Sequence, residues 1–253
     1  MRHSLDGTRV LITGGNGLLG RELVTAFADE GAVVVNADVR NPSGLRSVTK
    51  NLYSLHMDIC SETSVETGVG LIESELGEVN VLVNNAKPLG RHYGEDFLVI
   101  DGDGWSETVV MNLNGLFLVT RRVARLMIDH KVAGVITNIA SIFGVVAPDF
   151  RVYEGTALSN PSEYAVIKGG VIAFTRYLAT YLAPYHIRVN ALSPGGIYDQ
   201  HPERFVKAYE SRTPLGRMAS PGDISVAALF LAAQTSTYMT GQNLIIDGGW
   251  TAW

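Results

Sequence analysis

Short runs of apolar residues alternate with longer amphipathic stretches along almost the whole chain. The first run, Arg9–Thr13, is rich in β-branched and other apolar residues and predicts a strand. A glycine-rich turn follows it, and residues 18–30 then carry the apolar period of a helix. Residues 32–38 predict a second, buried strand. Strand, helix and strand in this order form a βαβ unit, which predicts parallel pairing with a right-handed crossover.

The same alternation continues to the end of the sequence. It predicts strands at residues 53–57, 79–83, 133–138, 187–192 and 243–246, and helices at residues 62–76, 105–130, 162–182, 201–210 and 223–233. Strands that alternate with helices favour a parallel sheet covered by helices on both faces. No linker, repeat or low-complexity tract divides the chain. We therefore expect a single doubly wound α/β domain, residues 1–253, with about seven strands.

Three glycines in the first turn have a spacing suited to a phosphate-binding loop. Gly14 permits a tight turn, Gly17 lets the backbone approach a pyrophosphate, and Gly20 lets the helix pack closely on the strand. The phosphates would lie at the positive end of the helix that starts near Leu18. Because the motif follows a strand and opens a helix, it indicates a Rossmann-type dinucleotide-binding fold rather than a glycine-rich surface loop.

An acidic residue closes the second strand, about twenty residues after the glycine turn. This residue, Asp38, can accept hydrogen bonds from a ribose diol, and its charge would repel a 2′-phosphate. We therefore predict NAD as the cofactor and regard NADP as the less favoured alternative. Arg40, two residues later, is the one feature here that favours NADP.

A second candidate site lies at the start of the fourth predicted helix. Asn160 is a favourable N-cap, Pro161 suits the first helical position, and Glu163 stands three residues after the cap. Tyr164 and Lys168 then lie four residues apart on one face of the helix. A phenol ordinarily titrates near pH ~10, and a neighbouring ammonium lowers its pKa by favouring the phenolate. The pair therefore suggests a general acid/base, although such pairs also occur on ordinary helix surfaces.

The bulk composition argues against several classes of partner. The 253 residues carry a net charge of −5, which gives no reason to expect binding to nucleic acid or to an anionic membrane. No apolar run approaches the roughly 20 residues needed to span a bilayer, and residues 1–7 lack the apolar core of a signal peptide. The single cysteine, Cys60, and the six histidines have no metal-ligand spacing. We expect a cytoplasmic protein without a metal.

Further polar and small residues recur at the ends of the predicted strands, where ligands bind in open α/β sheets. With the motifs above they form one ordered set: Thr13-Gly14-x-x-Gly17-x-x-Gly20, Asp58-Ile59, Asn84-Asn85-Ala86, Asn112, Ser141, Tyr164-x-x-x-Lys168, Pro194-Gly195 and Asp247-Gly248-Gly249. In this order the set resembles the short-chain dehydrogenase/reductase family over nearly the whole chain. The resemblance implies an NAD(P)-dependent oxidoreductase that interconverts a secondary alcohol and a carbonyl by hydride transfer. It also implies a homotetramer.

By analogy with that family, four residues would form the catalytic site. Ser141 would hold the substrate oxygen, and Tyr164 would be the general acid/base. Lys168 would bind the nicotinamide ribose and lower the pKa of Tyr164. Asn112 would help to hold a proton-relay water, unless it is only a structural amide within its helix. The cofactor would contact Gly14, Asn16, Gly17, Leu18, Leu19, Asp38, Asp58, Ile59, Asn85, Ala86, Lys87, Tyr164, Lys168, Pro194, Gly195, Gly196 and Ile197.

The chain departs from the classical branch of the family at several positions. The middle glycine, Gly17, stands one residue early, a spacing that belongs to the extended branch with its epimerases. An epimerase that uses NAD transiently is therefore one alternative, and a dinucleotide-binding regulator without turnover is another. Lys87 replaces the glycine that usually follows Asn-Asn-Ala, and Asp199 replaces a threonine that commonly contacts the carboxamide.

The sequence between the serine and the tyrosine is longer than usual. Ser141 and Tyr164 are 23 positions apart, and residues 151–159 are the extra loop, which we expect to form part of the substrate wall. Polar residues in this region and after Asn85 favour a sugar or another polar polyol as the substrate; the alternative is that they only solvate surface loops. The candidates are Arg91, His92, Arg151, Tyr153, Glu154, Tyr198 and Gln200.

Overall fold

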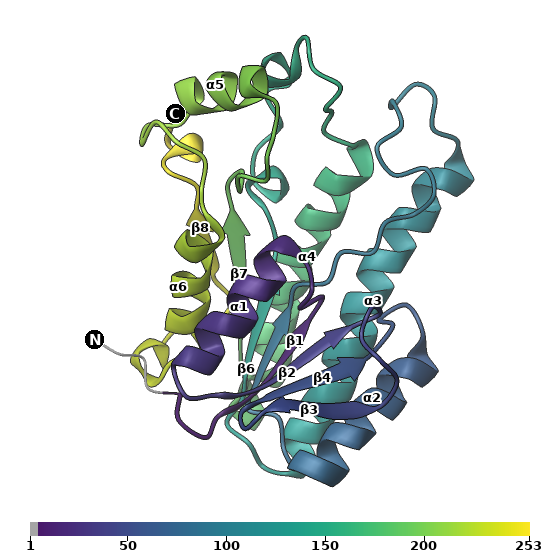
Figure 1. The fold of residues 1–253 in the computed structure, drawn as a ribbon, viewed down its shortest axis with the longest axis vertical. Coiled ribbons are helices and arrows are strands. Elements are labelled where there is room, and N and C mark those ends of the chain that lie inside the picture. Colours follow the sequence, from purple (N-terminus) through teal and green to yellow (C-terminus); the bar gives the residue numbers. More distant parts are fainter. Residues whose placement is uncertain (1–4) are drawn as a thin grey trace.

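The computed structural model describes residues 5–253, in which one sheet carries helices on both of its faces (Figure 1). The expectations placed on residues 1–4, including those on a signal peptide and on His3, lie outside the described residues. Within residues 5–253, no helix is long and apolar enough to cross a bilayer.

Eight strands form the sheet, in the order β3-β4-β2-β1-β5-β6-β7-β8. The strands are β1 Arg9–Thr13, β2 Val33–Asp38, β3 Leu45–Thr49, β4 Leu52–His56, β5 Val81–Asn84, β6 Val135–Ile139, β7 Arg188–Pro194 and β8 Asn243–Ile246. The chain leaves β1 toward β2 and β4, and later returns to β5 on the other side of β1. This reversal creates a topological switch point at the carboxyl ends of β1 and β5, where ligands bind in such sheets.

The seven predicted strands are all present, and β3 is the eighth. It pairs antiparallel with β4 at the edge of the sheet, whereas all the other neighbours are parallel. Four of its five residues are exposed, so the sequence carries no apolar run there. The pattern of apolar residues could not predict a strand that buries so little.

Residues 5–253 contain six α-helices, five of which cover the sheet. They are α1 Leu18–Asp29, α2 Glu62–Leu76, α3 Gly102–Asp129, α4 Ser162–Leu182, α5 Glu203–Arg212 and α6 Pro221–Ala232. Short 3-10 helices are η1 Ile142–Gly144, η2 Phe150–Tyr153, η3 Ala183–Tyr185, η4 Gln234–Ser236 and η5 Trp250–Ala252. Helices α1 and α6 pack together on one face, while α2, α3 and α4 pack side by side on the other. Helix α5 lies apart from these layers, at the top of Figure 1.

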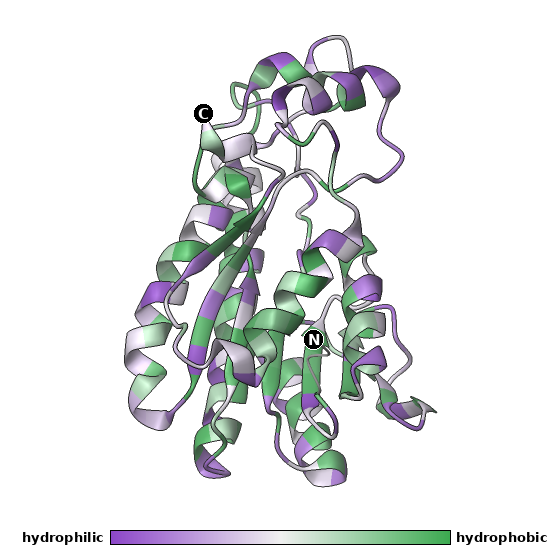
Figure 2. Ribbon diagram, turned by 90° about the vertical axis from the view of Figure 1, so that its left-hand side faces the viewer, coloured by the Kyte–Doolittle hydropathy of each residue, from purple (hydrophilic) through white to green (hydrophobic). Residues whose placement is uncertain are grey.

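Each face of the sheet has its own hydrophobic core. Ile12, Phe27 and Ile224 belong to the core beneath α1 and α6. Leu11 and Met127 belong to the core beneath α2 and α3. Figure 2 shows hydrophobic residues concentrated along the strands and on parts of the helices, with hydrophilic residues also spread over the helices and loops. Each fully buried aliphatic side chain contributes roughly 1.5–3 kcal/mol to the free energy of folding. The two cores therefore stabilise the sheet, and with it the residues at the carboxyl ends of the strands.

The N-cap of α4 differs from the prediction, although its first residue does not. The helix begins at Ser162, and Pro161 occupies the N-cap in an extended conformation, so Asn160 does not cap it. The side-chain amide of Asn160 instead donates to the Tyr153 hydroxyl at 3.3 Å. Fully buried Glu163 accepts the backbone N–H of Gly94 at 3.2 Å, which ties the start of α4 to the loop before α3.

Candidate active site

A cleft of about 710 Å³ opens at the carboxyl edge of the sheet. Residues that follow β1, β2, β5, β6 and β7 all contribute to its wall, as expected for ligands at a switch point. Most residues proposed from the sequence line it: Gly14, Gly17, Leu18, Leu19, Asp38, Asp58, Ile59, Asn85, Ala86, Lys87, Ser141, Tyr164, Lys168, Pro194, Gly195, Gly196 and Ile197. Asn16 and Asn112 do not.

The glycine turn is packed so closely that two of its positions admit no side chain. Gly14 has a φ of +66°, and a Cβ there would lie 2.7 Å from the Cα of Ala86. A Cβ at Gly20 would collide with the carbonyl oxygen of Gly14. Gly17 is less crowded, because a Cβ there would meet only that same carbonyl oxygen, at 3.3 Å. The turn therefore keeps bare backbone at the start of α1.

Helix α1 presents unsatisfied backbone donors to the cleft. Its N-cap, Gly17, supplies no capping side chain, and the first turn contains no acidic residue. The first N–H groups of a helix lack internal partners, and the helix dipole makes this end positive. Such an end fits the pyrophosphate of a dinucleotide.

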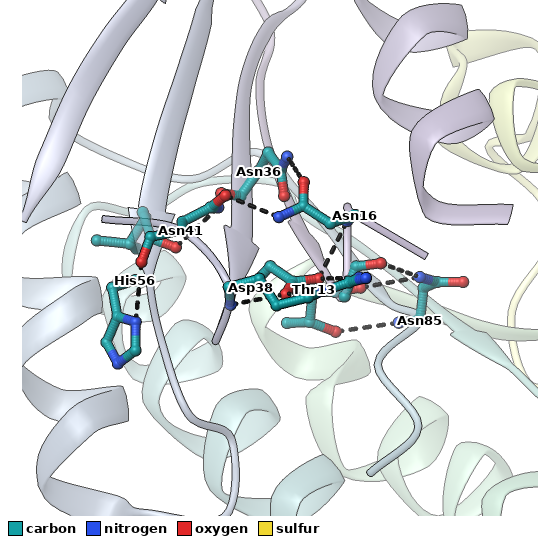
Figure 3. Close-up of polar contacts among 10 residues, drawn as sticks. Thr13, Asn16, Asn36, Asp38, Asn41, His56 and Asn85 are labelled. Atoms are coloured by element: carbon teal, nitrogen blue, oxygen red, sulfur yellow. Dashed lines mark hydrogen bonds and ion pairs between the residues drawn. The ribbon is translucent and has the colours of Figure 1, made fainter. Parts of the chain in front are cut away.

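Polar side chains hold this turn in place (Figure 3). The Asn85 amide donates to the carbonyl oxygens of Thr13 and Gly14 at 3.0 and 3.1 Å. The Asn16 amide donates to Asn41 at 2.8 Å, and its oxygen accepts from Asn36 at 2.9 Å. The side chain of Asn16 thus supports the turn from behind, which explains why it does not line the cleft.

The carboxylate of Asp38 is buried and already has several partners. It accepts the backbone N–H groups of Asn16 and Arg40 at 3.0 and 2.9 Å, and the Arg40 guanidinium approaches it to 3.0 Å. Burial by itself would raise the pKa of Asp38, but the hydrogen bonds from Arg40 and Asn16 outweigh this and lower the pKa. Asp38 is therefore an anion at the end of β2. Its partner Arg40 lies on the surface, where its side chain is 60% exposed.

Ser141, Tyr164 and Lys168 meet on the wall of the cleft. Ser141 follows β6, and its hydroxyl accepts the N–H of Phe143 at 3.2 Å. Lys168 is buried; its Nζ donates to the carbonyl oxygen of Ile139 at 2.7 Å and lies 5.6 Å from the centre of the Tyr164 ring. A β-strand end and one turn of α4 thus bring together the three groups that the sequence analysis selected.

The electrostatics of this group differ from the expectation. Burial raises the pKa of Tyr164, and a hydrogen bond with Ser141 offsets only part of the rise. Burial, followed by repulsion from Lys87, lowers the pKa of Lys168 to about 7. Lys168 is not among the causes of the Tyr164 shift, because it is itself desolvated and donates to the Ile139 carbonyl. That Lys168 lowers the pKa of Tyr164 when the cofactor is bound stays a prediction.

Asn112 lies deeper, in the middle of α3. Its amide donates to the carbonyl oxygens of Pro88 and Thr108 at 2.8 and 2.9 Å, so its N–H groups are used within the protein. Asn112 and Lys168 nevertheless both line a small separate cavity of about 20 Å³. A polar cavity of this size has room for about one water molecule.

Most of the polar residues proposed for the substrate do not reach the cleft. Arg91 pairs with Glu107, His92 with Glu95, and Arg151 with Asp149, all near the surface. Tyr198, Gln200 and Glu154 also lie outside its wall. Of the proposed set only Tyr153 lines the cleft, which confirms that the extra loop contributes to the wall.

The outer wall of the cleft contains residues that the sequence analysis missed. They are Phe143, His201, Phe205, Tyr209 and Met218, and all but His201 belong to one hydrophobic cluster. Tyr153 packs on Phe205 with ring centres 5.3 Å apart, and the Tyr209 hydroxyl accepts the N–H of Gly196 at 2.5 Å. The aromatic spacing of Phe205 and Tyr209 on α5 was the available signal, but it equally suits a helix packed on a core.

Cys60 lies just outside the cleft, two residues after Asp58. The residue is exposed overall, but its thiol donates to the carbonyl oxygen of Met111 at 3.8 Å, and its N–H donates to the Asp58 carboxylate at 2.9 Å. Partial burial, with the nearby charge of Asp58, raises the pKa of the Cys60 thiol to about 11. Within residues 5–253, no three His, Cys, Asp or Glu side chains are grouped as metal ligands.

Comparisons with known proteins agree with this geometry. The family model described as enoyl-(acyl carrier protein) reductase matches residues 16–251. The chain belongs to the short-chain dehydrogenase/reductase family. A curated family member, the 3-oxoacyl-(acyl-carrier-protein) reductase FabG of Thermotoga maritima, is 33% identical over 256 residues, which are 97% of this chain and 98% of that protein.

Two solved short-chain dehydrogenase/reductase structures share the whole fold. The enzyme of Leptospira borgpetersenii with bound NAD+ has a TM-score of 0.88 and 37% identity, covering 97% of this chain and 93% of that one. A gluconate 5-dehydrogenase of Burkholderia cenocepacia in complex with NADP and tartrate has a TM-score of 0.81 and 28% identity, covering 100% and 98%. The family assignment makes the chain an oxidoreductase of CH–OH groups with a nicotinamide dinucleotide.

Proposed function

We propose that the protein is an NAD-dependent dehydrogenase that interconverts a secondary alcohol and a carbonyl compound. The observation that carries the proposal is the meeting of Ser141, Tyr164 and Lys168 in the cleft that also contains the glycine turn. Oxidation of an alcohol by hydride transfer requires a group that takes the hydroxyl proton and a site that binds the dinucleotide. The cleft contains a candidate for each.

The residues present fit a dinucleotide along the length of the cleft. The bare backbone at Gly17 and the free donors of α1 would hold the pyrophosphate. Asp58 and Ile59 would flank the adenine, and residues 194–197 would pass along the nicotinamide. When bound, the cofactor supplies the hydride acceptor in alcohol oxidation and the hydride donor in carbonyl reduction.

The protein's own residues would move the proton. In the oxidation direction, Ser141 holds the alcohol oxygen and the Tyr164 oxygen accepts its proton. Lys168 would bind the nicotinamide ribose and, with any positive charge brought by the bound ligand, favour the phenolate form of Tyr164. A water in the cavity between Asn112 and Lys168 would carry the proton onward.

Asp38 is the basis for proposing NAD rather than NADP. Its carboxylate can accept hydrogen bonds from a ribose diol, whereas a 2′-phosphate would meet an ionised, buried acid. Arg40 is exposed and would have to move aside for the ribose to reach that carboxylate. The ratio of kcat/KM for NAD and NADP, measured side by side, tests this preference.

The wall of the cleft also supports a polar substrate. Tyr153, His201 and Lys87 add polar groups near the catalytic residues, so we propose a sugar-derived or comparable polyol substrate. We further propose that the protein is a cytoplasmic homo-oligomer, in keeping with its single cysteine and the exposed apolar side chains on α3 and α4. Cell fractionation tests the location.

Replacement of the proton-transfer group tests the main proposal. We expect Tyr164→Phe to lower kcat about 100-fold or more, because general acid/base catalysis contributes on the order of 10²–10⁴. Cofactor affinity should change little, since the ring and its packing remain. Absorbance of the reduced nicotinamide reports turnover, and protein fluorescence titration reports cofactor binding.

The same assay separates the alternatives, with Tyr185→Phe as a matched control on the exposed turn η3. Near-native turnover by Tyr164→Phe would falsify the assigned role. Product formed without net cofactor reduction would indicate the epimerase, and tight cofactor binding without chemistry on any alcohol would indicate the regulator.

A further inference from the structure

Lys87 places a cation beside the catalytic tyrosine, at a position where the family commonly has glycine. It follows β5 directly after Asn85 and Ala86 and lines the cleft. Its Nζ lies 5.1 Å from the centre of the Tyr93 ring and 5.4 Å from that of Tyr164. The ammonium therefore sits between two aromatic rings, one of which carries the reacting hydroxyl.

No carboxylate in the described part of the chain forms an ion pair with Lys87. Desolvation lowers the pKa of Lys87, and no nearby acid opposes that effect. Three acids line the cleft: Asp38 is bound to Arg40, Asp58 accepts the N–H of Cys60, and Asp199 forms no ion pair with Lys87 or Lys168. The reacting end of the cleft thus holds two ammonium groups, Lys87 and Lys168, and no anion pairs with either.

The loop that carries Lys87 and Tyr93 is held in this position by α4. Glu163 accepts the N–H of Gly94 at 3.2 Å, and the Ser159 hydroxyl donates to the carbonyl oxygen of Gly94 at 3.5 Å. These contacts fix the residue next to Tyr93 against the start of α4. Lys87 itself is exposed on the cleft wall, so its ammonium is open to an anionic group that enters the cleft, and an ammonium–carboxylate hydrogen bond is among the strong ones.

We propose that the Lys87 ammonium binds a carboxylate of the substrate, and that the enzyme acts on hydroxy acids in preference to neutral alcohols. This inference rests on the proposed dehydrogenase function, since it names the substrate class of the same site. One ammonium matches the single charge of a carboxylate. Its place over the Tyr164 ring puts that carboxylate within a few carbons of the carbinol that Tyr164 deprotonates. Lys87 is then a specificity residue, while Ser141 and Tyr164 handle the reacting oxygen.

A binding experiment on the enzyme saturated with NAD tests this without requiring turnover. The probes are L-tartrate and L-threitol, which share a four-carbon skeleton with two central hydroxyls and differ in having carboxylates or hydroxymethyl groups. We expect calorimetry to show tartrate binding at least tenfold more tightly than threitol to the native protein. Lys87→Met, which keeps most of the side-chain length, should reduce that ratio to within threefold, and Lys87→Arg should preserve most of it.

Three results would overturn the inference. The first is equal binding of tartrate and threitol by the native protein. The second is an unchanged ratio in Lys87→Met. The third is a loss of NAD affinity in Lys87→Met as large as the loss of tartrate affinity, which would assign the lysine to the cofactor. Thermal melting of each variant shows that it is folded.

A kinetic arm distinguishes this inference from the proposed function. Gluconate and glucitol, with other matched pairs of acid and neutral alcohol, are tested for NAD reduction. We expect Lys87→Met to lower kcat/KM for acids at least tenfold more than for the matched neutral alcohols, mainly through KM. Equal losses for acids and alcohols would place Lys87 in the reaction itself and contradict the inference. Absence of turnover with every compound would refute the dehydrogenase, while the calorimetric ratio would still report on Lys87.

Discussion

Lys168 is a buried lysine whose ammonium meets a carbonyl oxygen and no carboxylate within the described residues. Its Nζ donates to Ile139 at 2.7 Å, and burial, with repulsion from Lys87, lowers its pKa to about 7. In an unfolded chain the same group titrates near ~10.4. Between these values the folded protein releases a proton that the unfolded chain keeps, so the charge of Lys168 is linked to stability.

This linkage predicts a pH dependence with a definite sign. Because the unfolded state binds more protons above pH 7, the free energy of unfolding should rise from pH 7 to pH 9, with about 2 kcal/mol contributed by Lys168. Urea unfolding of the cofactor-free protein measures it, and Lys168→Met should remove that contribution. Cys60 acts in the opposite sense, because its pKa is raised to about 11 in the folded protein, but both proteins contain it and it cancels in their comparison. Identical pH slopes for both proteins would contradict the prediction.

Residue types and spacing were enough to predict that Ser141, Tyr164 and Lys168 lie together in one cleft. They did not predict the direction in which the pKa of each group is shifted. Tyr164, Lys168 and Ser141 could be selected because each follows a recognisable element. The raised pKa of Tyr164 depends on burial, which a linear pattern does not report. For the same reason Arg91 and His92 looked available for a substrate, although each has a nearby carboxylate partner.

At the scale of elements, the first turn of α1 packs directly on the backbone of the glycine turn, because neither carries a side chain at the contact. A Cβ at Gly20 would collide with the Gly14 carbonyl oxygen and lie 2.8 Å from the Cα of Gly15. These are backbone atoms of the turn, so relief would require the turn to move. The start of α1 and its free N–H groups would move with it.

We therefore expect Gly20→Ala to destabilise the protein by about 1–3 kcal/mol, as overpacking does, and to weaken NAD binding at least tenfold. Gly70→Ala is the matched control within α2, where a Cβ would meet nothing within 4 Å. It should stabilise the protein by roughly 0.5–1 kcal/mol, because alanine favours a helix over glycine. Thermal unfolding and cofactor titration measure both variants. Equal effects of the two substitutions would show that backbone crowding at Gly20 is unimportant.

Elements that bury a face were predictable from the sequence, and those that do not were missed. The period of apolar residues placed α1, α2 and α4 within a residue or so of their observed bounds. Strand β3 is mostly exposed and left no such signal. Helix α3 begins three residues before the predicted start, at Gly102, because the Asp101 carboxylate caps it by accepting the N–H of Gly104 at 2.7 Å.

At the scale of the whole molecule, one outer face is unusually apolar. Val110 and Phe117 on α3 and Val166 on α4 are exposed, and further along α4 Tyr177 and Tyr181 stack with ring centres 5.8 Å apart. Helices α3 and α4 pack side by side, so these side chains face outward from neighbouring elements. Exposed apolar side chains gathered on neighbouring helices suit a contact between copies of the chain.

We predict that the native protein is a homotetramer and that this face is one of its interfaces. Phe117→Asp should shift the mass measured by light scattering after gel filtration to a smaller species, because a carboxylate would be buried there without a partner. Val48→Asp on the exposed edge strand β3 is the control and should leave the mass unchanged. A native monomer, or a tetramer unaffected by Phe117→Asp, would remove this face from consideration.

The chain's only sulfhydryl lies two residues beyond Asp58, which lines the cleft where we propose that the adenine binds. Since its pKa is raised to about 11, little of it is thiolate in neutral solution, and it should resist oxidation and react slowly with alkylating reagents. A maleimide dye would couple slowly near neutral pH, where it prefers thiols to amines, and would label one known position because the chain has a single cysteine. Such a dye would report nucleotide arrival in real time, with no second cysteine to remove first.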